Sequence, residues 1–151
     1  MESRTDMIAQ LQRYYALWRE SNSMYENWAK NHGLSLNSVM VLYSFYEDGR
    51  TCTQKMISQK WVIPKQTVNS ILKEFEKRGF IELVPIPADK RNKYIRLTLE
   101  GKEYVNTIIE ELRDLELYVM EQMGMDSMTS LNDNLALFVE LFYRGGKREN
   151  E

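Results

Sequence analysis

The sequence predicts a mainly α-helical chain with one small β-hairpin, an α+β fold built around a winged helix-turn-helix lobe. Apolar residues recur at intervals of three and four through most of the 151 residues, which is typical of amphipathic helices. Between residues 80 and 98 the apolar period drops to two on either side of a basic segment, which is typical of a hairpin. We expect a single domain, residues 1–151, with the winged lobe at 35–100 and a helical dimerisation lobe at 5–34 and 101–145.

The composition is that of an intracellular protein. A chain of 151 residues can bury a core without disulfides or metals. Cys52 is the only cysteine, which excludes an internal disulfide and suits a reducing compartment. No stretch approaches the roughly 18 apolar residues of a membrane span, and residues 1–6 do not open a secretory signal. We therefore expect a cytoplasmic protein with no membrane partner.

The charge is strongly asymmetric along the chain, although the net charge at pH 7 is only −2. Residues 50–102 contain twelve Lys or Arg against five Asp or Glu, a net of +7, and the remainder has eight basic and seventeen acidic residues, a net of −9. A basic segment inside an acidic chain orients one face toward a polyanion. A polyanion is therefore the predicted partner of this segment.

The first two helices are predicted from their apolar spacing and their caps. Residues 6–31 have the spacing of one long amphipathic helix, for which Thr5 or Asp6 can serve as the cap. Ser35 can cap a second helix, which continues to about residue 46.

Two short helices with a tight connection follow, which is the spacing of a helix-turn-helix. Thr53 can cap the first, residues 54–60, and Pro64 opens the second, residues 64–78. Polar side chains in the first turns of a helix that enters a major groove can reach phosphates and base edges. These residues are Lys65, Gln66, Thr67, Asn69 and Ser70. Gln66 and Asn69 suit adenine contacts or simply face water, whereas Lys65 and Thr67 suit phosphates.

A hairpin follows the second short helix. Residues 80–84 and 94–98 read as strands, and two prolines between them exclude a central strand, so residues 85–93 are expected to form the tip. The tip carries three cations within four residues, namely Lys90, Arg91 and Lys93. The guanidinium of Arg91 suits a narrow minor groove, and a solvated basic turn is the other interpretation.

Two long helices complete the chain. Thr98 can cap residues 99–123, Gly124 ends that helix, and residues 128–143 form the last one with a heptad seam. The terminal helices have long apolar stripes that the local chain cannot cover, so we expect a homodimer. The predicted dimerisation residues are Ile8, Leu11, Leu112, Leu115, Leu131, Leu135, Phe138 and Phe142.

Two motifs stand out. Asp89-Lys90-Arg91 is followed by Leu97-Thr98-Leu99-Glu100-Gly101, and residues 66–81 close with Phe75-Glu76-Lys77-Arg78-Gly79-Phe80-Ile81. The first is similar to Asp-Arg-Arg then Leu-Thr-x-x-Gly, the wing signature of the MarR family of bacterial transcriptional regulators, with Lys90 where Arg is usual. The second resembles the recognition helix of that family and its exit, with Phe75 where Leu is usual. The resemblance covers almost the whole chain.

The resemblance implies a homodimeric DNA-binding transcriptional regulator, a repressor, on a pseudo-palindromic operator with half-sites about one helical turn apart. It implies that Arg91 enters a minor groove and that Asp89 holds the shape of the wing by pairing with a nearby arginine. It also implies a small aromatic or phenolic effector. Candidate pocket residues are Tyr15, Trp18 and Tyr25, although a helical aromatic stripe also fits a core or a dimer interface.

Other functions leave weaker traces in the sequence. A winged helix can also act as a protein-interaction module whose basic wing binds an acidic partner. Cys52 beside cations fits either a redox switch or an inert small hydrophobe. One histidine and one cysteine far apart give no metal site, and no phosphate loop, nucleophile elbow or His-based dyad indicates an enzyme. We expect no catalysis, no metal and no cofactor.

Overall fold

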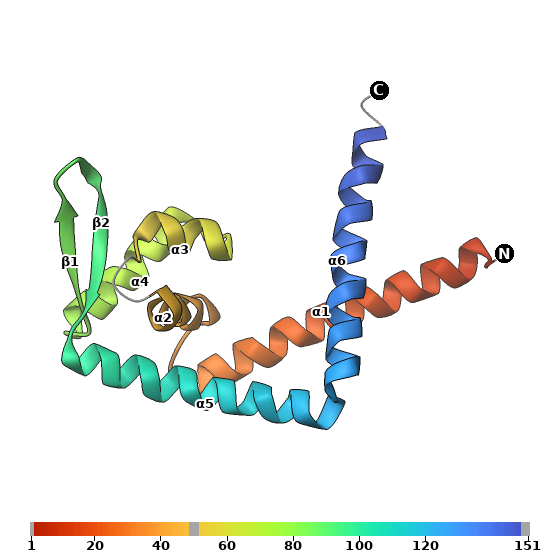
Figure 1. Cartoon of the computed structure of the whole chain (residues 1–151), viewed down its shortest axis with the longest axis horizontal. Helices are drawn as coiled ribbons and strands as arrows, with labels where there is room; N and C mark the ends of the chain where they lie inside the picture. The colour runs from red at the N-terminus through yellow and green to blue at the C-terminus, as the bar shows by residue number, and fades with distance from the viewer. Residues whose placement is uncertain (1, 49–51, 149–151) are drawn as a thin grey trace. The chain divides into compact units, whose positions relative to one another are not determined.

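The computed structural model describes residues 2–48 and 52–148. Its elements are helices α1 (Arg4–Asn31), α2 (Leu36–Asp48), α3 (Gln54–Trp61) and α4 (Lys65–Lys77), strands β1 (Ile81–Ile86) and β2 (Asp89–Leu97), and helices α5 (Leu99–Met123) and α6 (Met125–Arg148) (Figure 1). This order confirms the predicted helical fold with one hairpin.

By its internal contacts the chain divides into two units, Met1–Ile109 and Glu110–Glu151, which are described separately. The predicted lobes, 35–100 and 5–34 with 101–145, divide the chain at other places and stay a prediction.

Side-chain caps fix the starts of the first three helices. Ser3 caps α1 in a capping box, because its Oγ accepts from the backbone N–H of Asp6 (3.1 Å) while the Asp6 carboxylate accepts from the N–H of Ser3 (3.3 Å). The helix therefore begins before the expected residue 6, and neither Thr5 nor Asp6 is its cap. Ser35 and Thr53 cap α2 and α3 as predicted, through the N–H groups of residues 38 and 56.

The turn between α3 and α4 has the tight geometry of a helix-turn-helix. The helix α3 ends at Val62, whose φ of 54° is left-handed, and the N–H of Val62 donates to the carbonyl of Ser58. The Oγ of Ser58 then donates to the carbonyl of Ile63 (2.7 Å), which is 5% exposed and anchors the turn. Pro64 is the residue before α4, where its missing N–H costs nothing.

The apolar row of α4 lies in the core of the first unit. Val68, Leu72 and Phe75 are at most 2% exposed, and the ring of Phe75 meets that of Phe45 edge-on at 6.5 Å. The same core receives side chains from every neighbouring element, namely Val39, Leu42, Ile57, Ile81, Ile95 and Val105. Because one face of α4 is fixed inward, its polar face lies at the surface.

The hairpin is longer than the sequence indicated. Strand β1 pairs antiparallel with β2 from Ile81↔Leu97 to Pro85↔Lys93, and an irregularity follows Pro85. Only residues 87–88 form the turn, so the prediction that residues 85–93 are all tip is wrong. The physical reason is that β1 is an edge strand, where a proline that lacks an N–H is tolerated beside a bulge. The other edge of β2 is occupied, because the N–H of Ile95 donates to the carbonyl of Cys52 (3.0 Å).

A close contact joins the exit of α4 to the start of α5. The hydroxyl of Thr98 donates to the carbonyl of Gly79 (2.6 Å) and accepts from the N–H of Gly101 (3.0 Å). The N–H of Thr98 donates to the carbonyl of Phe80 (3.0 Å). A Cβ on Gly101 would lie 1.9 Å from that carbonyl oxygen, so only glycine fits. We call Gly79, Phe80, Thr98 and Gly101 the α4–α5 joint.

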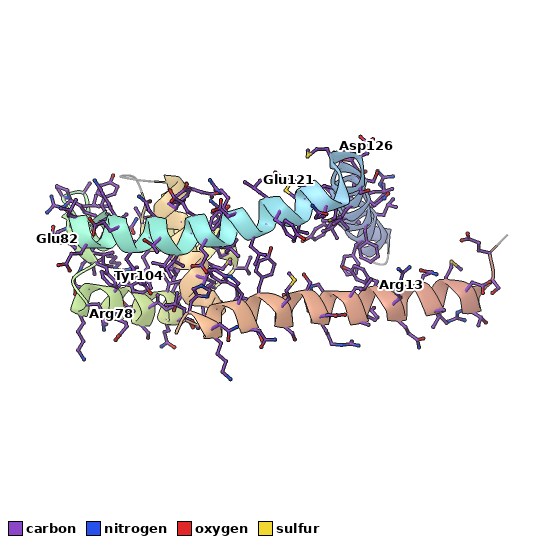
Figure 2. The ribbon with its side chains drawn as sticks, turned by 90° about the horizontal axis from the view of Figure 1, so that it is seen from below. Arg13, Arg78, Glu82, Tyr104, Glu121 and Asp126 are labelled. Carbon is purple, nitrogen blue, oxygen red and sulfur yellow. The ribbon has the colours of Figure 1, made fainter. Side chains whose placement is uncertain are left out.

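An aromatic stack covers the joint. The rings of Phe80 and Tyr104 stack at 4.4 Å, and the Arg78 guanidinium lies over both, at 4.7 Å and 5.1 Å from their centroids. Figure 2 shows Arg78 and Tyr104 at this end of α4 and α5. The stack adds cation–π attraction to the hydrogen bonds of the joint.

The second unit consists of the rest of α5 and of α6. Gly124, with a φ of 84°, ends α5 as predicted, and α6 turns sharply away from it (Figure 1). The helix α6 runs from Met125 to Arg148, so the predicted limits of 128 and 143 were too narrow at both ends. Among the described residues no helix is both long and apolar enough to cross a membrane.

We expect Gly101→Ala to lower the free energy of unfolding by about 3 kcal/mol, because the added methyl group must displace the Phe80 backbone. Urea denaturation measures the change. Gly145→Ala is the matched control, since Gly145 is also helical and has nothing within 4 Å of an added Cβ. There the better helix propensity of alanine should leave the protein equally or slightly more stable. Equal midpoints for Gly101→Ala and the wild type would contradict the close contact.

Candidate nucleic-acid interface

The outward face of α4 carries the predicted recognition residues in its first two turns. Lys65, Gln66 and Ser70 are exposed, and Thr67 and Asn69 are half-buried. The hydroxyl of Ser70 donates to the carbonyl of Gln66 (3.0 Å), so it is satisfied within the helix. Pro64 gives α4 no side-chain cap, so the N–H groups of the first turn and the positive end of the helix dipole face outward.

The wing presents cations near its tip. Arg91 and Lys93 are exposed, and Lys90 belongs to β2, although its side chain lies outside the described residues. Asp89 Oδ1 accepts a hydrogen bond from the backbone N–H of Arg91 (3.1 Å). The carboxylate therefore contacts the main chain of the tip, and its pairing with an arginine side chain stays a prediction.

The carboxylate–arginine pair of the wing lies nearer its base. Arg96 and Glu82 are register partners on β2 and β1, and the Nε of Arg96 donates to the Glu82 carboxylate (2.9 Å). Both side chains are more than half exposed, so the pair adds little stability. Its consequence is electrostatic, because it compensates the charge of Arg96 and leaves the excess positive charge of the wing toward the tip.

A cleft of about 150 Å³ lies where α3, α4 and the wing tip meet. Its lining residues are Gln54, Lys55, Lys65, Asp89, Arg91 and Asn92. The Nε2 of Gln54 donates to the carbonyl of Lys65 (3.3 Å), which ties the first turn of α3 to the first turn of α4. Sequence reasoning selected Lys65, Asp89 and Arg91 but missed the other three. One signal in the sequence could have indicated two of them. Gln54 and Lys55 directly follow Thr53, the cap of the first helix of the helix-turn-helix.

Comparison with known proteins identifies the family. A model of the MarR family matches residues 32–92. The DNA-binding transcriptional repressor ScoC of Bacillus subtilis (strain 168) is 31% identical over 108 residues, which are 71% of this chain and 51% of ScoC. The solved structure of NMB1585, a MarR family regulator from Neisseria meningitidis, is 28% identical with a TM-score of 0.79, and the match covers 94% of this chain and 99% of that one. The chain belongs to the MarR family.

The fold of this MarR-family chain extends to more distant structures. MepR of S. aureus, solved in complex with DNA, is 21% identical with a TM-score of 0.71, and the match covers 84% of this chain and 96% of MepR. That similarity concerns the fold alone. The chain spans about half the length of the curated relatives it matches, 51% in the case of ScoC.

The predicted dimerisation residues of the MarR-family chain divide into two groups. Leu112 is 2% exposed, so it is already buried within one chain and offers no surface to a partner. The other seven are 38–71% exposed, a large apolar surface for residues of their size. They are Ile8, Leu11, Leu115, Leu131, Leu135, Phe138 and Phe142.

Two of the three predicted pocket residues of α1 are exposed in the single chain. Tyr15 and Trp18 are 48% and 60% exposed, and Tyr25 is half-buried. Their assignment to an effector pocket stays a prediction. His32 Nδ1 lies 2.8 Å from the carbonyl oxygen of Trp28, and the two rings stack at 3.9 Å, so this histidine closes the end of α1.

Cys52 is fully buried, and its surroundings oppose thiolate formation. The pKa of its thiol is raised from 9.0 to about 12, mainly by burial and also by the negative charge of Asp48, against a smaller opposing effect of Lys60. The ammonium of Lys60 is held by Glu47 (2.5 Å), and this hydrogen bond is the main reason that the pKa of Lys60 is raised. A thiol that stays protonated is a poor nucleophile, so the structure disfavours the redox alternative.

We expect Cys52 in the native protein to resist alkylation by iodoacetamide at neutral pH, because the thiol is both buried and protonated. Mass spectrometry after timed quenching measures the rate. The urea-unfolded chain serves as control and should react at the rate of an ordinary cysteine. Equal alkylation rates in the native and unfolded states would show that the thiol of the native protein is accessible to the reagent.

The same pKa shift predicts a pH dependence of stability. The unfolded thiol ionises at lower pH than the folded one, so its contribution to the free energy of unfolding is complete below about pH 9 and is lost as the pH rises toward about 12. Denaturation of the wild type and Cys52→Ala should therefore give a steeper decline above pH 9 for the wild type. Parallel declines would contradict the shift.

Proposed function

We propose that this chain is a sequence-specific DNA-binding transcriptional regulator, a repressor without enzymatic activity of its own, which acts as a homodimer in the cytoplasm. One observation carries the proposal. The exposed polar turns of α4 and the basic tip of the wing border the same cleft, within a segment of net charge +7. A helix fits a major groove and an arginine-bearing hairpin fits the adjacent minor groove, so the two elements match the surface of duplex DNA.

The relatives support the same function. ScoC is named a DNA-binding transcriptional repressor. The chain spans about half of ScoC, so we propose the DNA-binding function for the shared part. The exposed polar residues of α4 and the wing support the same function.

The exposed apolar surface of the terminal helices supports a homodimer. Exposed leucines and phenylalanines at heptad spacing along α6 suit a second copy of the same helix. Two copies would place two α4 helices in successive major grooves, about 34 Å apart, on a pseudo-palindromic operator. A small aromatic effector bound near α1 would release the operator only if it favoured one separation of the two α4 helices over the other.

Fluorescence anisotropy tests the proposed function directly. The full chain is titrated against a labelled duplex from upstream of its own coding region, across a salt series, with scrambled duplex as competitor. Binding that survives the scrambled competitor is expected. If the scrambled duplex displaced the labelled duplex equally well, and a genome-wide fragment selection also returned no specific sequence, the basic wing would belong to an interface with an acidic protein partner instead.

We expect Gln66→Ala and Arg91→Ala to act differently on the selected operator. Loss of a bidentate base contact by Gln66 should relax the preference at one base pair by about 1–3 kcal/mol. Loss of the Arg91 charge should weaken binding to all sequences and reduce the salt slope by about one unit per protomer. Anisotropy on the operator and on single-base variants separates the two effects. Equal losses on every sequence for Gln66→Ala would reassign that residue to the backbone.

The dimer is tested with Leu135→Glu, because Leu135 is 48% exposed and its replacement does not open the core. Sedimentation velocity should give a dimer for the wild type and a monomer for the variant. The circular dichroism spectrum of the variant should show the same helical signal as that of the wild type. Glu121→Gln is the control for a change of charge on exposed helix surface. A monomeric wild type would exclude the proposed architecture.

A further inference from the structure

The cleft between α3, α4 and the wing has a composition that suits an anion. Lys55, Lys65 and Arg91 contribute three positive charges, and Asp89 contributes one negative charge. The amides of Gln54 and Asn92 complete the lining with neutral hydrogen-bonding groups. The three cations are all exposed, so their charges are accessible to a ligand in the cleft.

The chain builds this cleft before any ligand binds. Gln54 connects its α3 wall to its α4 wall through the carbonyl of Lys65. The segment before α3 pairs with β2, since Thr53 bridges Tyr94 and Cys52 accepts from Ile95, and this pairing fixes the start of α3 beside the wing. Asp89 is engaged with the main chain of Arg91, so it orders the third wall at the tip.

The position of the cleft matches one feature of duplex DNA. A protein that inserts a helix into the major groove and a hairpin into the next minor groove must straddle the sugar–phosphate strand that separates them. In this chain the space between those two elements is the cleft. We propose that the cleft holds one phosphodiester of that strand, with Lys55 and Lys65 on one side and Arg91 on the other. The proposal rests on the proposed DNA-binding function and adds Lys55, Gln54 and Asn92 to its contact surface.

The three walls have different tasks in this site. Lys55 and Lys65 supply flexible ammonium groups that follow the phosphate as point charges, whereas the planar guanidinium of Arg91 can bind two oxygens at once. Gln54 is a positioning residue, because its amide holds the carbonyl of Lys65 and with it the register of the two helix starts. Such a contact sets where α4 stands along the groove and carries no base preference.

The test uses Lys55→Met in the full chain on the selected operator. We expect the magnitude of the salt slope to fall by about one unit per protomer and the affinity to fall several-fold on all sequences alike. Lys77→Met is the matched control, since Lys77 is an exposed lysine of α4 that lies about 18 Å along the helix from Lys65. Its salt slope should stay at the wild-type value.

Single methylphosphonate substitutions along each half-site then locate the phosphate. One position is expected at which removal of the charge weakens the wild type but hardly affects Lys55→Met, because the partner charge is already gone. If every position weakens both proteins equally, or if Lys55→Met leaves slope and affinity unchanged while the wild type binds its operator, the inference is wrong and the proposed function stands. If the wild type binds no DNA, the proposed function itself fails.

A free anion is distinguished by titration of the DNA-free protein with inorganic phosphate, followed by NMR. No saturable binding at millimolar concentration is expected, because the cleft is open and a phosphate held only by its walls stays largely hydrated. Saturable binding that Lys55→Met abolishes would assign the cleft to a free anion and overturn the DNA assignment.

Discussion

The helix α4 is held in place by a close contact between the segment that follows it and the segment that leads into α5. Gly79 and Gly101 permit this approach, one through a positive φ and the other because no side chain fits against the Phe80 carbonyl. Thr98 bonds both sides of the contact. The start of α5 is therefore joined to the exit of α4 by hydrogen bonds and by the stacked rings of Phe80 and Tyr104.

The opposite end of α4 is fixed by a second set of contacts. The buried Ile63 anchors the turn before α4, and Gln54 holds the first turn through the Lys65 carbonyl. The strand-like pairing of Cys52 and Thr53 with β2 then joins α3 to the wing. Both ends of α4 are therefore fixed relative to the hairpin. The proposed contact of α4 and the wing with two adjacent grooves requires such a fixed relation.

Local chemistry was readable in the sequence where a few neighbouring residues decide it. The caps Ser35 and Thr53 and the helix stop at Gly124 were predicted, because each depends on residues within one turn. The cap of α1 was misplaced, since Ser3 gains a reciprocal bond from Asp6 that neither Thr5 nor Asp6 would have as the cap. The length of the hairpin was misjudged, because a proline is excluded from a strand only where its missing N–H would have to donate to a neighbouring strand.

The sequence by itself determined the order of the helices, the amphipathic face of α4, the basic segment and the motif at Thr98 and Gly101, since periodicity, charge and turn chemistry are local properties. Only the tertiary structure decided that Cys52 is buried and protonated, that Leu112 lies within one chain, and that Lys55 shares a cleft with Arg91. These properties depend on residues that are distant in the sequence and are brought together by packing. Burial and proximity of that kind have no period and no motif, so they become visible only when the core has placed the elements.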